Sequence, residues 1–190
     1  MGTDARAADE KAPFVIVDYD SAWPVVFERE KSRIVSMIGP HVLAIEHVGS
    51  TAVPGLAAKP IIDILVGIPS LREAAACVVP LASIGFEYVP EYEAEIPDRR
   101  YFRKGPPTGR THHLHMVEHG GAFWERHLLF RDFLRVHPER AREYARLKRD
   151  LASRFRGDRE AYTNGKKDFV RRVEEDARRW RAVTASRTAI

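Results

Sequence analysis

The chain has 190 residues, of which 44% are hydrophobic and 31% are charged, and its formal net charge is +4. A chain of this length and composition can bury a sizeable core, and it contains no apolar stretch long enough to cross a membrane, which excludes a membrane-spanning protein. The single cysteine, Cys77, excludes a disulfide framework. We therefore expect a cytoplasmic globular protein with no secretory leader and a buried, inert thiol.

Positive charge is concentrated in the C-terminal part of the chain. Residues 121–190 contain 19 Lys and Arg against 11 Asp and Glu, whereas residues 1–120 contain 12 against 16. This excess fits a polyanionic partner, either the phosphates of a nucleotide or a nucleic acid. It is equally typical of a solvated, arginine-rich helical surface, and the composition alone does not choose between the two.

The pattern of apolar residues and of helix-ending residues predicts the order of the strands and helices. In chain order we expect a disordered tail at 1–12, a strand at 14–20, a helix at 20–38, strands at 41–48 and 59–68, a helix at 70–85, edge strands at 86–91 and 99–105, a strand at 111–118, and helices at 121–137, 138–155 and 158–183. This order is typical of an α+β fold, with a small mixed β-sheet flanked by helices and followed by C-terminal helices. We expect one domain over 13–183, with its sheet at 13–120, its helical part at 121–183 and a tail at 184–190.

An aspartate stands in the middle of the most apolar strand, PIIDILV. Alternation places Ile61, Asp63 and Leu65 on one face of this strand. Burying a carboxylate without a partner is costly, so Asp63 is expected where the sheet meets a cleft. Thirteen residues earlier, Gly49-Ser50 follows another strand directly, and a glycine there lets a backbone N–H and a small hydroxyl approach a phosphate.

Together these stretches resemble the signature of the nucleotidyltransferase superfamily. That signature consists of a strand, a Gly-Ser pair, a spacer and a second strand with metal-binding carboxylates. The resemblance is closest to the GrpB family, in EHVGSTAVPGLAAKPIIDI, HLH, FRDFLR, YARLK and AYTNGKKDF, which together cover roughly 15–178. It implies a small mixed sheet of nucleotidyltransferase topology with C-terminal helices. Some GrpB-type domains are found joined to dephospho-coenzyme A kinase.

The carboxylate pattern departs from that superfamily at one point. Its members usually have two acids at i and i+2, which hold a pair of Mg²⁺ ions for an in-line displacement. In this chain Ile61 and Leu65 occupy the positions beside Asp63. A second ligand would have to come from Glu46 or from Glu118, and without one only a one-metal site or no metal site remains.

Three histidines lie near these motifs. In THHLHMVE, alternation places His113 and His115 on one face, opposite the apolar Leu114 face, and we expect both to lie near Asp63. Such a pair can contact phosphate, act as a general base or bind a metal, and it is also a common feature of half-exposed strands. Zinc is disfavoured because no third ligand is suitably spaced. His47, beside Gly49, is a further candidate for the lining of the cleft.

The C-terminal helices carry three pairs of residues at spacing i, i+4, which places each pair on one helical face. The pairs are Arg131 with Arg135, Tyr144 with Lys148, and Tyr162 with Lys166. The cations suit a triphosphate, whereas the tyrosines could stack on a base or pack against the sheet. Each pair alone is more often a solvated face.

Several other charged residues are candidates for ion pairs or for phosphate contacts. We expect Asp132 to form an ion pair with Arg135, and Lys59, just before the Asp63 strand, to bind phosphate. Alternation places Arg99, Tyr101 and Arg103 on one face of an edge strand, where they could contact phosphates or protect the edge.

The favoured hypothesis is an enzyme that uses Mg²⁺ or Mn²⁺ to transfer a nucleotidyl or phosphoryl group from a nucleoside triphosphate to an unknown acceptor. The first alternative is a non-catalytic nucleotide- or cofactor-binding module with a degenerate metal site. RNA binding is least favoured, because the basic residues alternate with acids and no aromatic platform is visible. The candidate catalytic residues are Asp63, Ser50, His113 and His115; the candidate phosphate-binding residues are Gly49, Ser50, Lys59, Arg131, Arg135, Lys148, Tyr162 and Lys166; the candidate metal ligands are Asp63 and Glu46.

Overall fold

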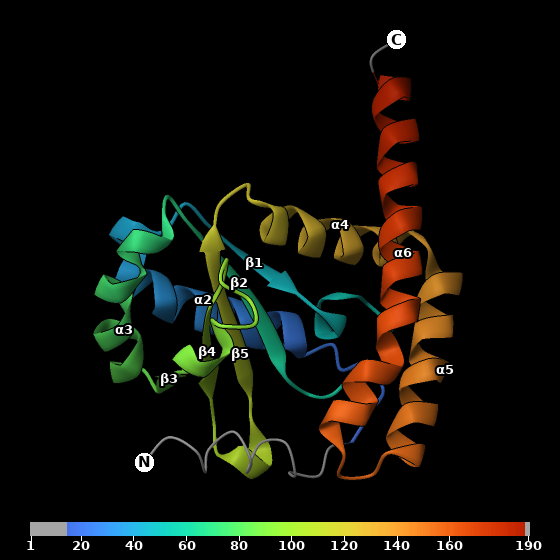
Figure 1. Ribbon diagram of the computed structural model, residues 1–190, viewed down its shortest axis with the longest axis horizontal. Helices are drawn as coiled ribbons and strands as arrows, with labels where there is room; N and C mark the ends of the chain where they lie inside the picture. Colours follow the sequence, from blue (N-terminus) through green and yellow to red (C-terminus); the bar gives the residue numbers. More distant parts are fainter. Residues whose placement is uncertain (1–14, 189–190) are drawn as a thin grey trace.

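A computed structural model describes residues 15–188 (Figure 1). The strands are β1 (Ala44–Val48), β2 (Ile62–Ile68), β3 (Phe86–Tyr88), β4 (Arg100–Lys104) and β5 (His112–Glu118), and the helices are α2 (Trp23–Ile38), α3 (Ala74–Ser83), α4 (Ala122–Val136), α5 (Pro138–Arg154) and α6 (Arg159–Thr188). The predicted α+β class, a mixed sheet with flanking and C-terminal helices, is confirmed. The tail expected at 1–12 lies outside the described residues.

The five strands form one sheet in the order β1-β2-β5-β4-β3. Only β2 and β5 run parallel, and the other neighbouring strands pair antiparallel. The register places Asp63 between Val48 of β1 and His113 of β5. The C-terminal end of β1 therefore lies next to the N-terminal ends of β2 and β5. The Gly-Ser turn and Asp63 are both at this end of the strands.

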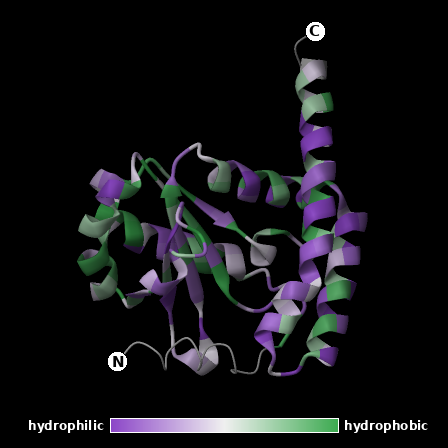
Figure 2. Cartoon of the chain, viewed as in Figure 1, coloured by the Kyte–Doolittle hydropathy of each residue, from purple (hydrophilic) through white to green (hydrophobic). Residues whose placement is uncertain are grey.

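One face of the sheet is covered by α2 and α3. Ile64 of β2 and Leu114 of β5 are fully buried there against Ile34 of α2 and Leu81 of α3. Cys77 also lies in this core and is fully buried, as expected for an inert thiol. Figure 2 shows β2 as an apolar strand near the middle of the sheet, whereas α6 is mostly hydrophilic. The apolar residues of β2 thus fix which face carries Asp63.

The opposite face of the sheet is shared between α4 and a cavity. Val48, Leu65 and Val117 pack there against Trp124 of α4. Alternation along β2 and β5 places Asp63, and with it the odd-numbered histidines of β5, on this same face. Asp63, His113 and His115 therefore point away from the main core, as predicted, whereas His112 lies on the core side beside Phe86.

The three C-terminal helices form a layer beside the sheet (Figure 1). Phe133 of α4, Tyr144 of α5 and Phe169 of α6 share an apolar cluster with Val53 and Leu56 of the loop after the Gly-Ser turn. This cluster holds α5 and α6 against the loop that leads into β2. Side chains of both helices consequently reach the end of β2 at Asp63.

Several predicted element boundaries were wrong. The segment at 14–20 is no strand among the described residues: only Val17 bridges to Ala58, since α2 begins a few residues later and Val15 is exposed. The predicted strand at 86–91 ends at Tyr88, because a 3-10 turn begins at Pro90. Helix α6 continues to Thr188, past the predicted end at 183.

The other elements differ from their predicted ranges by a few residues at their ends. The helix expected at 70–85 begins with a 3-10 turn, in which Ser70 accepts a hydrogen bond from the Arg72 N–H, and the α-helix starts at Ala74. Such shifts are common, because helix ends tighten into 3-10 geometry. In the part of the chain that the structure describes, no helix has the length and apolar character needed to cross a membrane.

Candidate functional site

The turn after β1 and the aspartate of β2 are in direct contact. Gly49 has φ 72° and ψ −170°, a conformation that only glycine adopts readily. A Cβ at this position would overlap the carboxylate of Asp63. The sequence motif of Gly-Ser followed by a distant aspartate is therefore one local structure, in which the absence of a side chain at Gly49 makes room for Asp63.

Two histidines of β5 hold the Asp63 carboxylate. His113 Nδ1 lies 3.1 Å from Asp63 Oδ1, and His115 Nε2 lies 3.9 Å from the same oxygen. Burial opposes ionisation of the acid, but the hydrogen bond from His113 and the nearby His115 outweigh it and hold the pKa of Asp63 well below its usual range. Because an ionised carboxylate only accepts, His113 donates to Asp63 from Nδ1. The predicted meeting of these three residues is confirmed.

His115 points away from the cavity into an aromatic cluster. Its ring lies 5.4 Å from that of Tyr101 and 5.9 Å from that of Phe123, and a nitrogen of Arg99 lies 3.5 Å from its Nδ1. Burial lowers the pKa of His115, although Asp63 works against that shift. His115 therefore contacts Asp63 from outside the cavity, whereas His113 lines the cavity itself.

The cavity of about 250 Å³ lies between the Gly-Ser turn, the start of β2 and the helices α5 and α6. It is lined by Ser50, Thr51, Ala58, Lys59, Ile61, Asp63, His113, Tyr144, Lys148, Tyr162, Thr163 and Lys166. Seven of the predicted site residues are in this set: Ser50, Lys59, Asp63, His113, Lys148, Tyr162 and Lys166. Sequence reasoning missed Thr51 and Thr163, although Thr51 directly follows the Gly-Ser pair and could have been found from that position.

Lys148 joins α5 to the Gly-Ser turn. Its side chain has 2% relative exposure, and its Nζ donates to Ser50 Oγ at 2.9 Å and to the carbonyl oxygen of Ala57. Desolvation, and then the nearby charges of Lys166 and Arg149, lower the pKa of Lys148 to about 7. The ammonium group is thus fixed in place beside the hydroxyl of Ser50.

Lys59 and Lys166 approach the same tyrosine. Their Nζ atoms lie 4.3 Å and 4.4 Å from the ring centroid of Tyr162. Desolvation and the charge of Lys166 lower the pKa of Lys59 to about 7, and desolvation lowers the pKa of Lys166 to about 8. The lining therefore brings three lysines together with one carboxylate, Asp63.

The two tyrosines of the lining pack against protein. Tyr144 is stacked on Phe169 with ring centroids 5.1 Å apart and planes 5° apart, and Phe130 contacts it edge-on. Tyr162 has 1% relative exposure. The aromatic contacts of Tyr144 are with residues of α4 and α6, and the expected packing against the sheet is not what these contacts show.

Arg131 and Arg135 do not reach the cavity. Arg131 is buried and donates to Glu46 Oε2 at 2.6 Å, to the His47 carbonyl oxygen at 3.0 Å and to Asp132 Oδ1 at 2.7 Å. Arg135 donates to the Ala52 carbonyl oxygen at 3.0 Å. The two guanidiniums therefore fasten α4 to β1 and to the turn after it. Asp132 forms ion pairs with both arginines, so the predicted pair with Arg135 is present.

The two candidates for a second metal ligand are engaged elsewhere. The Glu46 carboxylate is held by Arg131. Glu118 lies five residues beyond His113 along β5, about 17 Å away at the rise of a strand, and it accepts from Leu71 N at 3.1 Å. Among residues 15–188 no cluster of three or more His, Cys, Asp or Glu could hold a metal ion. The residues present do not fit a resident two-metal centre.

His47 supports the turn from the core side of β1. It is stacked on Phe27 at 4.8 Å, and its Nε2 lies 3.0 Å from Thr51 Oγ1, which donates to the Ile61 carbonyl oxygen at 3.2 Å. Desolvation lowers the pKa of His47 to about 4. His47 is absent from the cavity lining, so the expectation that it lines the cleft was wrong.

Strand β4 pairs with β3 on one side and β5 on the other, so the prediction of an edge strand at 99–105 was wrong. The arginines in and beside β4 do not reach the cavity. Arg103 is fully buried and donates to both carboxylate oxygens of Glu87, and Arg110 pairs with the same acid at 3.3 Å. Arg99 lies over the ring of Tyr101, 4.9 Å from its centroid. These three arginines therefore contact residues of β3 and β4 and do not line the cavity.

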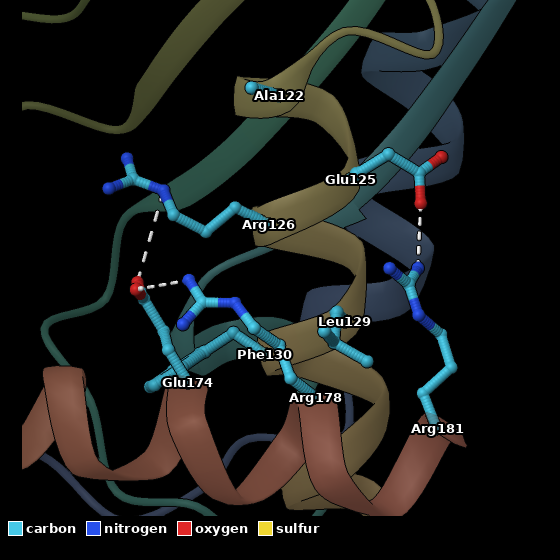
Figure 3. Close-up of a pocket in the computed structure, with 8 residues that line it drawn as sticks. All are labelled: Ala122, Glu125, Arg126, Leu129, Phe130, Glu174, Arg178 and Arg181. Atoms are coloured by element: carbon cyan, nitrogen blue, oxygen red, sulfur yellow. Dashed lines mark hydrogen bonds and ion pairs between the residues drawn. The ribbon is translucent and has the colours of Figure 1, made fainter. Parts of the chain in front are cut away.

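A second groove of about 250 Å³ lies between α4 and α6 (Figure 3). Glu174 contacts Arg126 and Arg178, at 3.9 Å and 3.6 Å, and Arg181 pairs with Glu125 at 2.8 Å. The groove is cationic in composition, but each of its arginines faces an acid of the same groove.

The arrangement is that of an α+β protein whose cavity lies where a mixed sheet meets C-terminal helices, and the chain belongs to the GrpB family. The family model described as GrpB protein matches residues 13–176. Among solved structures, the chain is similar to the conserved protein GrpB from Enterococcus faecalis, with a TM-score of 0.79 and 36% identity over 86% of this chain and 96% of that one. The resemblance of the motifs to the GrpB family is thereby confirmed.

Two longer relatives share this segment. The chain is 43% identical to the UPF0157 protein YqkA of Bacillus subtilis (strain 168), over 87% of this chain and 48% of that protein. It is 31% identical to a dephospho-CoA kinase of Mycolicibacterium paratuberculosis (strain ATCC BAA-968 / K-10), over 90% of this chain and 47% of that protein. The chain therefore spans about half the length of these two relatives.

Proposed function

We propose that the chain binds a nucleotide or a similar phosphate-bearing small molecule in the cavity beside Asp63. The observation that carries this proposal is the charge of the lining, which has Lys59, Lys148 and Lys166 but one carboxylate. Lysine ammonium groups bind phosphate as point charges, and a site lined by several of them attracts a polyanion.

The electrostatics of the cavity support an anionic ligand. Desolvation disfavours the charged forms of the three lysines, and the charge of Lys166 disfavours those of Lys59 and Lys148 further, as their lowered pKa values indicate. An anion would supply the missing counter-charge, and each charge-assisted hydrogen bond to it would contribute about 1.5–3 kcal/mol. The hydroxyl of Ser50, held 2.9 Å from Lys148 Nζ, is placed to share the same ligand.

Two further observations favour a small ligand over a nucleic acid. A relative about twice as long is named a dephospho-CoA kinase, which is consistent with a ligand of the nucleotide class. Several arginines of α5 and α6 pair with acids, as Arg140 does with Glu143 and Asp176. Such pairs reduce the attraction that the excess of positive charge in residues 121–190 exerts on RNA.

The second candidate is an enzyme that transfers a nucleotidyl or phosphoryl group from a nucleoside triphosphate to an acceptor. The observation that favours it is the Asp63–His113 pair, in which an ionised carboxylate holds Nδ1 of a histidine that lines the cavity. A histidine oriented in this way can accept a proton from an acceptor hydroxyl. In this candidate Ser50 and the three lysines hold the phosphates.

A divalent cation has one protein carboxylate to bind at this site. Mg²⁺ or Mn²⁺ carried by a triphosphate is commonly held by one or two carboxylates together with phosphate oxygens, and it offsets phosphate charge. Asp63 is the residue that would contact it, because Glu46 is bound by Arg131. We propose such a nucleotide-borne ion for the enzyme candidate only.

A thermal-shift and calorimetric titration of the full chain with ATP, with and without Mg²⁺ or Mn²⁺, tests both candidates. We expect ATP to raise the melting temperature, and Lys148→Met to abolish the shift while Arg178→Met in the α4–α6 groove leaves it intact. A shift that persists in metal-free buffer supports the binding module. Turnover that requires the metal and is lost in Asp63→Asn, with the fold retained, supports the enzyme. The absence of a shift with any nucleoside triphosphate would reject both.

A further inference from the structure

The cavity presents cations to a ligand but no open aromatic face. Tyr162 has 1% relative exposure and two ammonium groups within 4.5 Å of its ring centroid, and Tyr144 is covered by Phe169. Proteins that hold a nucleobase commonly stack it on an aromatic ring or on an arginine plane. Among the described residues, neither tyrosine of the lining offers an open face and no arginine lines the cavity, which leaves the imidazole of His113, held by Asp63, as the remaining ring.

The apolar part of the lining is also covered. Ala58 and Ile61 have 1% and 9% relative exposure, so each offers little surface to a ring. A pocket that buries a drug-sized ligand is mostly apolar and aromatic, with a few polar groups that fix its orientation. This cavity has the reverse composition.

Three polar groups of the lining that could bind the edge of a base already have a protein partner. Thr51 Oγ1 donates to the carbonyl oxygen of Ile61, and Ser50 Oγ accepts from Lys148. His113 is held by Asp63. Thr163 is exposed at the rim and is the remaining hydroxyl of the lining apart from the two buried tyrosines.

We propose that this pocket binds the phosphate end of its ligand and does not discriminate among nucleobases. The inference rests on the proposed function and narrows its ligand to polyphosphates and nucleoside polyphosphates of any base. Lys59, Lys148 and Lys166 surround the phosphates, and the nucleoside extends past Thr163 into solvent. The Asp63 carboxylate offsets one of the three ammonium charges of the lining. The remaining positive charge attracts an anion of charge −2 or more.

Calorimetric titration of the full chain with tripolyphosphate, ATP, GTP and adenosine tests this inference. We expect the first three to bind with dissociation constants within about threefold of one another and adenosine to give no heat. ATP or GTP binding at least about tenfold more tightly than tripolyphosphate, or binding of adenosine alone, would overturn the inference while leaving the proposed function in place. If none of the three phosphate compounds binds, the proposed function fails together with the inference.

Two variants separate a phosphate contact from a nucleoside contact. Lys59→Met should weaken the binding of tripolyphosphate and of ATP by the same factor, because both ligands would lose the contact with the same ammonium group. Thr163→Val removes a rim hydroxyl at an exposed position and should change neither dissociation constant by more than about twofold. A selective loss of ATP in Thr163→Val, with tripolyphosphate unchanged, would show that the nucleoside is bound and would reject the inference.

Discussion

Two hollows of about 250 Å³ differ in how their positive charges are balanced. In the groove between α4 and α6, Glu174 faces two arginines and Glu125 faces a third, and these arginine side chains are 46–60% exposed (Figure 3). In the cavity beside Asp63, three lysines share one lining carboxylate, and Lys148 is almost completely buried. Exposed ion pairs contribute little, whereas buried cations with few acids are costly without a ligand. The small number of carboxylates around buried cations, and not the number of basic residues, distinguishes the candidate site.

The largest expected effect concerns the backbone on which the cavity depends. Gly49→Ala should lower the free energy of unfolding by about 3 kcal/mol, because it adds a strained backbone conformation and an overlap with Asp63. The groove has no equivalent, since its charged side chains stand on regular helices. Urea unfolding monitored by circular dichroism measures the loss.

Gly55→Ala is the matched control for that substitution. Gly55 also has positive φ, 76°, but a Cβ there meets no atom within 4 Å. It should therefore cost only the conformational strain, about 1 kcal/mol. Equal losses in the two variants would show that contact with Asp63 contributes nothing to the requirement for glycine at Gly49.

The next effect compares the two hollows by ligand binding. Lys148→Met should weaken tripolyphosphate binding about 30-fold, because one charge-assisted hydrogen bond of about 2 kcal/mol is lost. Arg178→Met in the groove should change the dissociation constant less than twofold, since its partner is Glu174. Calorimetry on both variants measures the difference, with circular dichroism as the check on folding. A comparable loss in Arg178→Met would place the ligand in the groove instead.

Much of the site could be predicted from the sequence because strands have a simple period. Alternation in β2 and β5 was sufficient to place Asp63 and His113 on one face, and the apolar partners Ile64 and Leu114 fixed which face that was. The Gly-Ser motif located the turn. The pairs of α5 and α6 that carry Lys148 and Lys166 also reached the cavity as expected.

The helical pair Arg131 and Arg135 shows why the rest could not be predicted. Its i, i+4 spacing is the same as that of Tyr144 and Lys148, so the local pattern contains no information on which helical face meets the cavity. The outcome depends on a carboxylate 85 positions earlier, Glu46, which receives the Arg131 guanidinium. The same contact removed Glu46 from the set of metal ligands. Long-range pairing of this kind is set by the packing of α4 against β1, which no short motif encodes.

The smallest expected effect is on stability and its dependence on pH. Lys166→Met should raise the free energy of unfolding at pH 7 by about 1 kcal/mol, because replacing a desolvated charge by an apolar side chain removes its cost. In the groove, Arg178→Met should change stability by less than about 0.5 kcal/mol, since exposed ion pairs contribute little. Urea unfolding at pH 7 without ligand measures both. Destabilisation by Lys166→Met would mean that the cavity already balances this lysine without a ligand.

The pH dependence follows from the folded pKa values of about 7 for Lys59 and Lys148 and about 8 for Lys166, which lie below the 10.5 of a lysine in the unfolded chain. Below pH 7 both the folded and the unfolded chain hold these protons, and the folded chain bears the full cost of the buried charges. As the pH rises from about 7 towards 10, the folded chain releases the protons first, so the unfolded chain binds more of them and these groups make stability increase. Lys166→Met should reduce that slope and Arg178→Met should not. Saturation with tripolyphosphate should flatten it as well, because a bound anion raises the lysine pKa values towards those of the unfolded chain.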